Sequence, residues 1–123
     1  MRKDFRLYLD DILDAVYQIR TYLADQDEEA FAKDRKTQDA IIRNLEIIGE
    51  AAGKLPEQIQ KDEPEIDWRK ISGLRNILIH EYFGINLPIV WDVVQNKLGP
   101  LETVCRRLLE RAVEPPDQET LLH

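Results

Sequence analysis

The sequence of 123 residues contains a single cysteine, Cys105, so an intramolecular disulfide is excluded. Only five glycines and six prolines are present, which is too few for a loop-rich or disordered chain. The first ten residues, MRKDFRLYLD, lack the uninterrupted apolar run that a signal peptide or a membrane span requires. We therefore expect an ordered cytoplasmic protein that makes no use of a membrane.

Sequence motifs for metal or phosphate binding are also missing. The spacings HxxxH, HExxH and CxxC do not occur, and neither does a glycine-rich phosphate loop. We therefore expect no metal and no cofactor. Cys105 lies in a periodic apolar stripe, which favours a buried structural thiol over a nucleophile. A net charge of −7 and a pI of about 4.8 give no general attraction to phosphate backbones, so binding of nucleic acid would require a local site.

What the chain does contain is apolar residues at steps of three and four, the pattern of amphipathic helices. The first stripe consists of Phe5, Leu9, Ile12, Val16, Ile19 and Leu23. Asp27 can then cap a short helical turn that is anchored by Phe31. The second stripe consists of Ile41, Leu45, Ile48, Ala52 and Leu55, and Gly49 within it allows a neighbouring segment to approach closely.

The second half of the chain predicts two further helices. Residues 56–67 read as a connector with one short helical turn, and we expect its acidic run KDEPEID to be solvated surface. Asp67 caps a third helix predicted over residues 68–83. Asn86 caps a fourth helix in which Pro100 predicts a kink. The apolar stripe of this last helix comprises Val90, Val94, Leu98, Leu101, Cys105, Leu108 and Ala112.

Four amphipathic helices with short links and no alternating strand pattern predict an all-α fold, namely an antiparallel up-down four-helix bundle with one short extra turn. The length suits a single domain, which we assign to residues 1–114. We expect residues 115–123 to form a flexible C-terminal tail.

The third predicted helix contains the segment LRNILIHEYF, in which polar residues interrupt an apolar sequence. On a straight helix its apolar residues spread over about 200°, counted from Ile71, which is wider than one face of a bundle. A second buried side is most simply covered by another copy of the chain. Arg75 falls inside this arc, where an unpaired cation is costly, so a partner is required.

Spacing alone leaves two partners open for Arg75. One is an acidic residue of the second helix, Glu46 or Glu50, which would give Arg75 a structural role. The other is a ligand phosphate, which a guanidinium group binds through two hydrogen bonds. Asn76 and His80 share a helical face, whereas Arg75 and His80 diverge by about 140°. A site that uses both is easier to build where two symmetry-related copies face each other.

The run from Arg75 to Tyr82 has the form RxxxxHxY, and it resembles the signature of HEPN domains, in particular of the HepT-like toxins. The phrases RNLEIIGEAA (43–52), DWRKISGLRN (67–76) and IVWDVV (89–94) are similar to that family as well. The resemblance covers roughly residues 3–112.

The resemblance implies a HEPN-like homodimeric bundle in which two copies of the motif line one cleft and act as a metal-independent endoribonuclease. Catalysis would fall to Arg75 and His80, with Asn76 in support and RNA cut to 2′,3′-cyclic phosphate ends. The family further implies a type VII-like toxin–antitoxin system. Its antitoxin, an MntA-like nucleotidyltransferase, would inactivate the toxin by AMPylation of Tyr82 and could assemble with it into a larger hetero-oligomer.

Two other hypotheses remain at this point. In the first, the chain is a non-catalytic helical module that binds a nucleotide or a nucleotidyltransferase, and Arg75 and His80 hold the ligand or the dimer. In the second, the motif is purely structural and Arg75 pairs with Glu46 or Glu50. An open cleft that exposes Arg75 and His80 favours catalysis, whereas a closed pair of Arg75 with a carboxylate favours the structural role.

Overall fold

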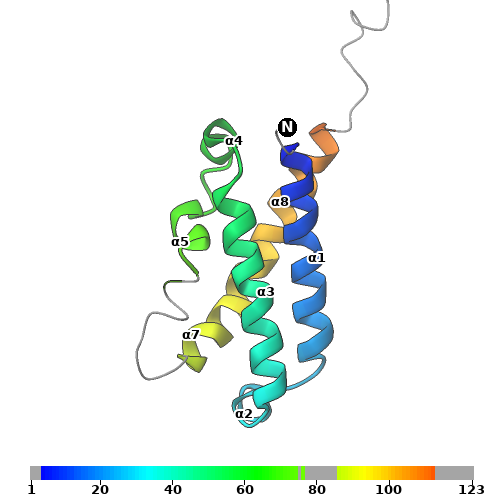
Figure 1. The fold of residues 1–123 in the computed structure, drawn as a ribbon, viewed down its shortest axis with the longest axis vertical. Coiled ribbons are helices and arrows are strands. Elements are labelled where there is room, and N and C mark those ends of the chain that lie inside the picture. Colours follow the sequence, from blue (N-terminus) through cyan, green and yellow to red (C-terminus); the bar gives the residue numbers. More distant parts are fainter. Residues whose placement is uncertain (1–3, 75, 77–85, 113–123) are drawn as a thin grey trace, which may run out of the picture.

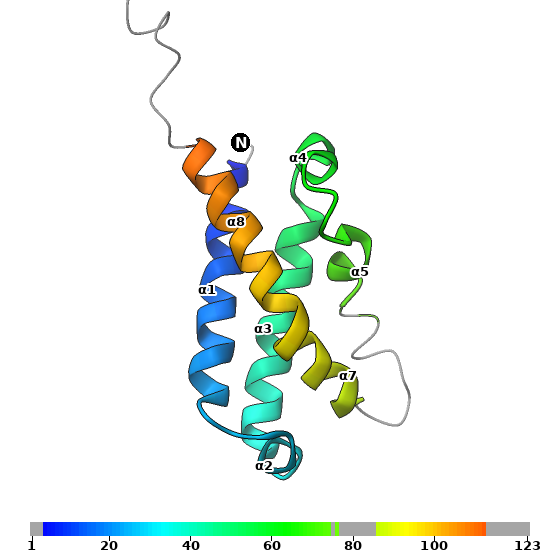
Figure 2. The same cartoon turned by 180° about the vertical axis from the view of Figure 1, so that it is seen from behind.

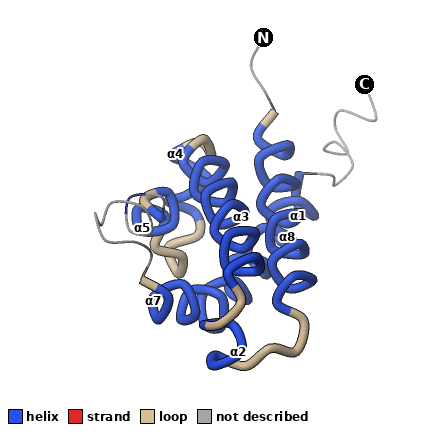
Figure 3. Tube along the Cα trace, turned by 60° about the horizontal axis from the view of Figure 1, so that its bottom comes forward, coloured by secondary structure: helices blue, strands red, loops and turns tan. Residues whose placement is uncertain are grey.

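A computed structural model of the protein describes residues 4–74, 76 and 86–112, and every regular element in these residues is helical (Figure 3). The body is formed by α1 (Phe5–Leu23), α3 (Arg35–Gly53) and α8 (Leu98–Ala112). Shorter elements join them: α2 (Glu28–Ala32), α4 (Glu57–Asp62), α5 (Trp68–Ser72), α7 (Leu87–Asp92) and the π-helical turn η1 (Val93–Lys97). The predicted all-α fold class is confirmed.

The long helices pack around one hydrophobic core. α1 contacts both α3 and α8, and α5 packs against α3. α1 and α3 run in opposite directions with α2 at their shared end (Figure 1), and α8 crosses the rear of this pair (Figure 2). The predicted stripes supply the fully buried side chains, among them Leu9, Ile12, Val16, Ile19, Ile41, Leu45, Ile48, Val90, Leu98, Leu101 and Cys105. Each large aliphatic side chain buried in this way contributes about 1.5–3 kcal/mol to the free energy of unfolding.

Side-chain caps define where several of the helices begin. The capping residues are Asp4, Asp27, Asp34, Asp67 and Asn86, and each accepts a hydrogen bond from a backbone N–H in the first turn of its helix. Such a cap stabilises a helix by about 1 kcal/mol relative to alanine. The predicted caps at Asp27, Asp67 and Asn86 are therefore confirmed.

The third helix differs from its prediction. It was expected to run without a break through residues 68–83, but α5 ends at Ser72 and Gly73 forms a turn before helical geometry resumes at Leu74 and Asn76. The Ser72 hydroxyl donates a hydrogen bond to the carbonyl of Trp68 (2.6 Å), which competes with the regular backbone pattern. Helical angles counted from Ile71 therefore do not carry past Gly73. The arc of about 200° no longer supports a homodimer, for which only the resemblance remains.

The irregularity expected at Pro100 takes a different form from a simple kink. The run from α7 through α8 is interrupted by η1, which ends three residues before Pro100. A proline within a helix lacks a donor and clashes with the carbonyl four residues earlier, here that of Asn96. A π-helical turn at this place changes the direction of the carbonyls that Pro100 would otherwise meet. Residues 113–123, which include the whole of the predicted tail, lie outside the described residues.

At Gly49, α3 lies in close contact with the backbone of α5. A Cβ atom built on Gly49 would lie 3.0 Å from the carbonyl oxygen of Ile71 and 3.7 Å from Cβ of Leu74. The first of these neighbours is backbone and cannot rotate away. The close approach predicted from the sequence is thus confirmed, and it requires the absence of a side chain at this position.

We predict that Gly49→Ala destabilises the protein, although alanine favours a helix over glycine by about 1 kcal/mol. Displacing α5 to relieve the contact costs about 1–3 kcal/mol, the range for an overpacked core. Urea denaturation should therefore show a net loss of unfolding free energy.

Gly99→Ala is the matched control, because an added Cβ there meets no described heavy atom within 4 Å. This variant should change the stability by less than about 0.5 kcal/mol, because the helical preference of alanine is offset by the restriction that Pro100 places on the preceding residue. Equal effects of both variants would contradict a tight contact at Gly49.

Candidate functional site

The residues predicted to form a catalytic site fall mostly in a part of the chain that the structure does not describe. Arg75, His80 and Tyr82 lie outside the described residues. Asn76 is described, and it is helical and exposed to solvent. We call residues 75–85 the motif segment. The structure describes the residues on either side of it, Leu74 and Asn86.

The start of this segment is held by the core. Leu74, which precedes Arg75, is only 3% exposed, and Ile71 one turn earlier is also buried. Asp67 caps α5 by accepting a hydrogen bond from the backbone N–H of Lys70 (3.2 Å). Trp68, the first residue of α5, is buried and donates its indole N–H to the carbonyl of Glu63 (3.0 Å). These contacts fix the direction in which the chain leaves α5.

The residues that follow the motif segment are also anchored to the bundle. Asn86 accepts a hydrogen bond from the backbone N–H of Ile89 (3.2 Å) and so caps α7. Val90 in the same helix is fully buried. The ring of Trp91 lies 5.7 Å from that of Phe31, centroid to centroid, which is an ordinary packing distance for an aromatic pair. The motif segment therefore connects two anchored points on the same bundle.

The two carboxylates considered as structural partners of Arg75 are both on α3. Glu46 lies 3.8 Å from Nη1 of Arg43, and its side chain is partly buried. Glu50 lies 3.4 Å from Nζ of Lys54 and is largely exposed. Both contacts are between residues of one helix, at spacings of three and four. A pairing of either glutamate with Arg75 stays a prediction, because Arg75 lies outside the described residues.

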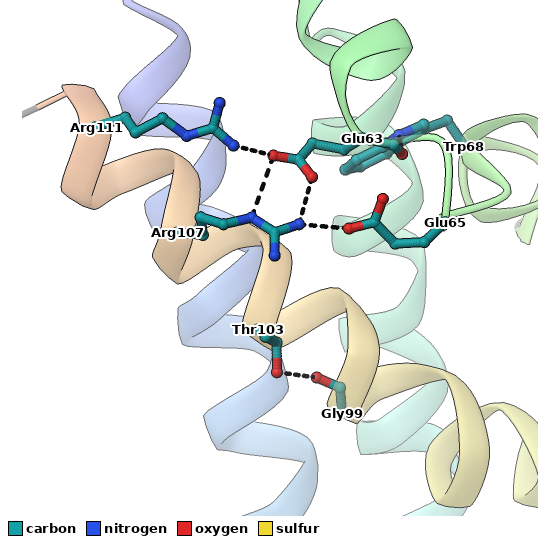
Figure 4. A network of polar contacts seen from close by, with 7 residues as sticks. All are labelled: Glu63, Glu65, Trp68, Gly99, Thr103, Arg107 and Arg111. Carbon is teal, nitrogen blue, oxygen red and sulfur yellow. Dashed lines mark hydrogen bonds and ion pairs between the residues drawn. The ribbon is translucent and has the colours of Figure 1, made fainter.

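Glu63 forms a polar network that the sequence reasoning missed. The run KDEPEID was expected to be solvated surface, but Glu63 within it is only 2% exposed. Its carboxylate accepts hydrogen bonds from Arg107 and Arg111 of α8, and Arg107 also contacts Glu65 (Figure 4). The expectation was wrong for Glu63 because arginines far along the chain neutralise its charge. Arg107 and Arg111 are four residues apart and hence lie on one helical face, and this spacing was the sequence signal for a binding partner of opposite charge.

This network joins the connector before α5 to the last helix. The carboxylate of Glu63 is held from α8, while its backbone carbonyl accepts the indole N–H of Trp68 and the N–H of Ile66. The hydrogen bonds that Arg107 donates to the carboxylates of Glu63 and Glu65 raise its pKa, so the guanidinium keeps its charge throughout the accessible pH range. The network therefore ties the connector and the first residue of α5 to α8.

The described residues offer little other reactive chemistry. Burial raises the pKa of Cys105 to about 12, so its thiol stays protonated at neutral pH. No group of three or more histidine, cysteine, aspartate or glutamate side chains among residues 4–74, 76 and 86–112 could hold a metal ion. In the same part of the chain, none of the helices is long and apolar enough to cross a membrane.

A pocket of about 530 Å³ opens between α5 and the helical run that follows the motif segment. We refer to it as the α5–η1 pocket. One wall is formed by Glu65, Ile66, Asp67, Lys70, Ile71 and Leu74. The other wall is formed by Ile89, Asp92, Val93, Asn96, Lys97 and Pro100. The residue before the motif segment and a residue of the first turn of α7 thus both line it.

The sequence is similar to those of proteins that are named as ribonucleases. The family described as "Ribonuclease HepT-like" matches residues 12–108. A protein of Methanocaldococcus jannaschii with the name "Putative RNase" is 46% identical over 97 residues, which cover 79% of this chain and 80% of that protein. The protein named "Probable ribonuclease HepT" of Thermococcus cleftensis is 38% identical over 102 residues, covering 83% of this chain and 93% of that one. No solved structure gives a significant match.

The helical bundle and the family match together define the class, a helical protein of ribonuclease type. The chain belongs to the HepT-like ribonuclease family. The match begins within α1 and ends within α8, so it includes the motif segment and both of its anchored ends.

We predict that Glu63→Gln lowers the free energy of unfolding by about 1–3 kcal/mol, because two arginines then lose a charged partner at a buried position. This range is below that of a fully buried pair, since the side chains of Arg107 and Arg111 remain about half exposed. Urea denaturation measures the change.

Glu57→Gln provides the matched control. Glu57 pairs with Lys61 at 3.3 Å, but both side chains are largely exposed, so the loss should be below about 0.5 kcal/mol. Equal effects of the two substitutions would argue against the special role of Glu63.

Proposed function

We propose that this protein is the toxin of a type VII-like toxin–antitoxin system and acts as a metal-independent endoribonuclease through Arg75 and His80. The observation that carries the proposal is the RxxxxHxY sequence from Arg75 to Tyr82 within a chain of the HepT-like ribonuclease family. The anchoring of both ends of the motif segment supports it, because catalysis requires side chains held in a defined geometry.

The residue types suit cleavage of RNA by its own 2′-hydroxyl. An imidazole, with an ordinary pKa of about 6.5, can take the proton from the 2′-hydroxyl near neutral pH. The 2′-oxygen then forms a bond to phosphorus while the bond to the 5′-oxygen breaks. A second proton donor protonates the departing 5′-oxygen. The products are a 2′,3′-cyclic phosphate and a 5′-hydroxyl, and no water or metal enters the reaction.

Arg75 and His80 have separate roles in this scheme. The guanidinium of Arg75 neutralises charge that develops on the phosphoryl oxygens. His80 acts as the base, and His80 of a second copy acts as the acid, so the proposal includes a homodimer with one shared cleft. Asn76 supports the site as a hydrogen-bonding group, which agrees with its exposed position.

The proposed control of this activity is AMPylation of Tyr82 by an MntA-like nucleotidyltransferase. The tyrosine oxygen attacks the α-phosphorus of ATP, and pyrophosphate leaves. Each AMP unit adds a negative phosphodiester near Arg75 in sequence, where it competes with RNA for the guanidinium. The modification is expected to inhibit the enzyme without unfolding it.

We predict that His80→Ala and Arg75→Ala each reduce RNA cleavage by at least about 10²-fold, the lower end of what positioned proton transfer contributes. Arg75→Lys should recover only part of the rate, since lysine keeps the charge but loses the paired hydrogen bonds. Cleavage of a fluorogenic oligoribonucleotide, with EDTA present, measures the rates.

His123→Ala, which changes the only other histidine, serves as the control and should leave the rate unchanged. Light scattering at micromolar concentration should give about twice the chain mass of 14.4 kDa for the parent and all variants. Full activity of His80→Ala, loss of activity in EDTA, or a monomeric parent would each refute this mechanism.

We predict that co-expression with the cognate nucleotidyltransferase increases the intact mass by multiples of one AMP unit and abolishes cleavage. Tyr82→Phe should remove both effects, because phenylalanine has no oxygen to form the phosphodiester. Intact-protein mass spectrometry and the cleavage assay provide the two measurements.

Tyr17→Phe is a suitable control, since Tyr17 is the most exposed tyrosine among the described residues and lies on α1. It should be modified like the parent. If the partner still silences Tyr82→Phe, then control operates by binding alone and the role of Tyr82 as acceptor is wrong.

A further inference from the structure

The α5–η1 pocket has an apolar floor and a polar rim. Ile66, Ile71, Leu74 and Val93 form the floor and are buried. Lys70 on one wall and Lys97 on the other are exposed at the rim. The volume of about 530 Å³ falls within the range of roughly 300–1,000 Å³ that is typical of small-ligand sites. The pocket therefore has the size and the layering of a site for a flat, partly polar ligand.

The wall formed by α7, η1 and the start of α8 presents one stripe of side chains, in which successive lining residues are alternately three positions and one position apart in sequence. Asp92 and Asn96 are adjacent in this stripe, and the amide of Asn96 donates a hydrogen bond to Oδ1 of Asp92 (2.7 Å). The stripe passes through η1, and π-helical turns occur frequently at functional sites. The wall thus offers a carboxylate, an amide and the ammonium group of Lys97 next to one another.

The acidic residues of the opposite wall already have partners within the protein. Glu65 is paired with Arg107, and a hydrogen bond from the backbone, followed by the contact with this arginine, lowers the pKa of Glu65. Asp67 caps α5 and lies 3.9 Å from Nζ of Lys70. Asp92, the third carboxylate of the rim, accepts its hydrogen bond from a neutral group, the amide of Asn96. The groups available to a ligand are thus the carboxylate of Asp92 with its adjacent amide and the ammonium group of Lys97, while Lys70 is shared with Asp67.

We infer that the α5–η1 pocket binds one nucleobase of the RNA substrate, next to the phosphate that is cleaved, and selects a base that carries an exocyclic amino group. The base lies with its faces against the aliphatic floor. Its amino group donates to Asp92, and Asn96 pairs with the neighbouring ring nitrogen or carbonyl. Lys70 and Lys97 contact the phosphates on either side. This inference rests on the proposed ribonuclease function.

The pocket adjoins the proposed catalytic segment, which supports a role in binding the RNA substrate. Leu74 is covalently joined to Arg75, and Leu74 is part of the floor. Asn76, which immediately follows Arg75, is exposed. A base held in the pocket therefore brings its own phosphate to the region where the motif segment begins. The selection follows from hydrogen-bond chemistry: adenine, cytosine and guanine have an amino group to donate to a carboxylate, and uracil has a carbonyl oxygen in its place.

The test measures binding separately from cleavage. The full chain, labelled with ¹⁵N, is titrated with AMP, GMP, CMP and UMP, and the side-chain amide signals of Asn96 are followed. AMP, GMP and CMP should shift these signals and bind at least about fivefold more tightly than UMP, the smallest discrimination expected of a good base contact. Equal affinities for all four nucleotides, or no change at Asn96, would overturn the inference.

Two substitutions sharpen the result. Asp92→Asn replaces one acceptor oxygen with an NH₂ donor and should shift the binding preference toward UMP. Lys97→Gln should weaken the binding of all four nucleotides alike. The matched controls are Asp39→Asn on α3 and Lys61→Gln on α4, which change exposed side chains outside the pocket lining and should bind like the parent. Circular dichroism confirms that each variant is folded. An unchanged preference in folded Asp92→Asn would contradict the assignment of Asp92.

The outcomes also separate this inference from the proposed function. RNA cleavage without nucleotide binding at Asn96 would refute the pocket and leave the ribonuclease intact. Binding without any cleavage would leave the pocket and refute the ribonuclease. Signals of Asn96 that depend on protein concentration in the absence of nucleotide would show that a second copy of the chain occupies the pocket, which would also refute the inference.

Discussion

The contact between α3 and the backbone of α5 at Gly49 is the constraint on which the geometry of the functional region depends. α5 has only five residues, and a helix of that length is not stable by itself in water. Its position is therefore set by what it packs against. Because Gly49 has no side chain, the carbonyl of Ile71 can lie directly on α3, and Leu74 enters the core immediately afterwards. The motif segment starts from this fixed point.

The network around Glu63 completes the placement of α5. Burying a carboxylate is costly, and two arginines offset that cost only because α8 presents them four residues apart. The network spans 44 residues between Glu63 and Arg107, so it forms only when both halves of the bundle are in place. Gly49 sets how closely α5 approaches α3, and Glu63 connects the first residue of α5, Trp68, to α8. A displacement at either residue would move the start of the motif segment.

The elements that were predictable from the sequence are those whose cause is local. Apolar spacing located α1, α3 and α8, and single residues such as Asp27, Asp67 and Asn86 located helix starts. The break at Gly73 was missed, because the apolar residues keep a helical spacing across it while the chain turns at Gly73. The partners of Glu63 and the walls of the α5–η1 pocket come from distant parts of the chain, which local periodicity does not pair. The predicted site residues Arg75, His80 and Tyr82 came from a motif, and their geometry remains a prediction.

The acidic character of the protein is compatible with a site for RNA because charge acts over short distances in salt. At about 0.1 M salt, interactions between exposed charges are largely screened beyond roughly 10 Å, so the net charge of −7 matters less than the groups near the substrate. Several acidic side chains are also neutralised by partners, as in the contact of Arg20 with Glu102 (2.5 Å), where the guanidinium lowers the pKa of the carboxyl group. Lys70 and Lys97, in contrast, face the same pocket from two walls. A phosphate at its rim would lie near these two ammonium groups, while two of the three carboxylates that line the same pocket, Glu65 and Asp67, are already paired with Arg107 and Lys70. The acidic remainder of the surface would discourage binding of RNA elsewhere.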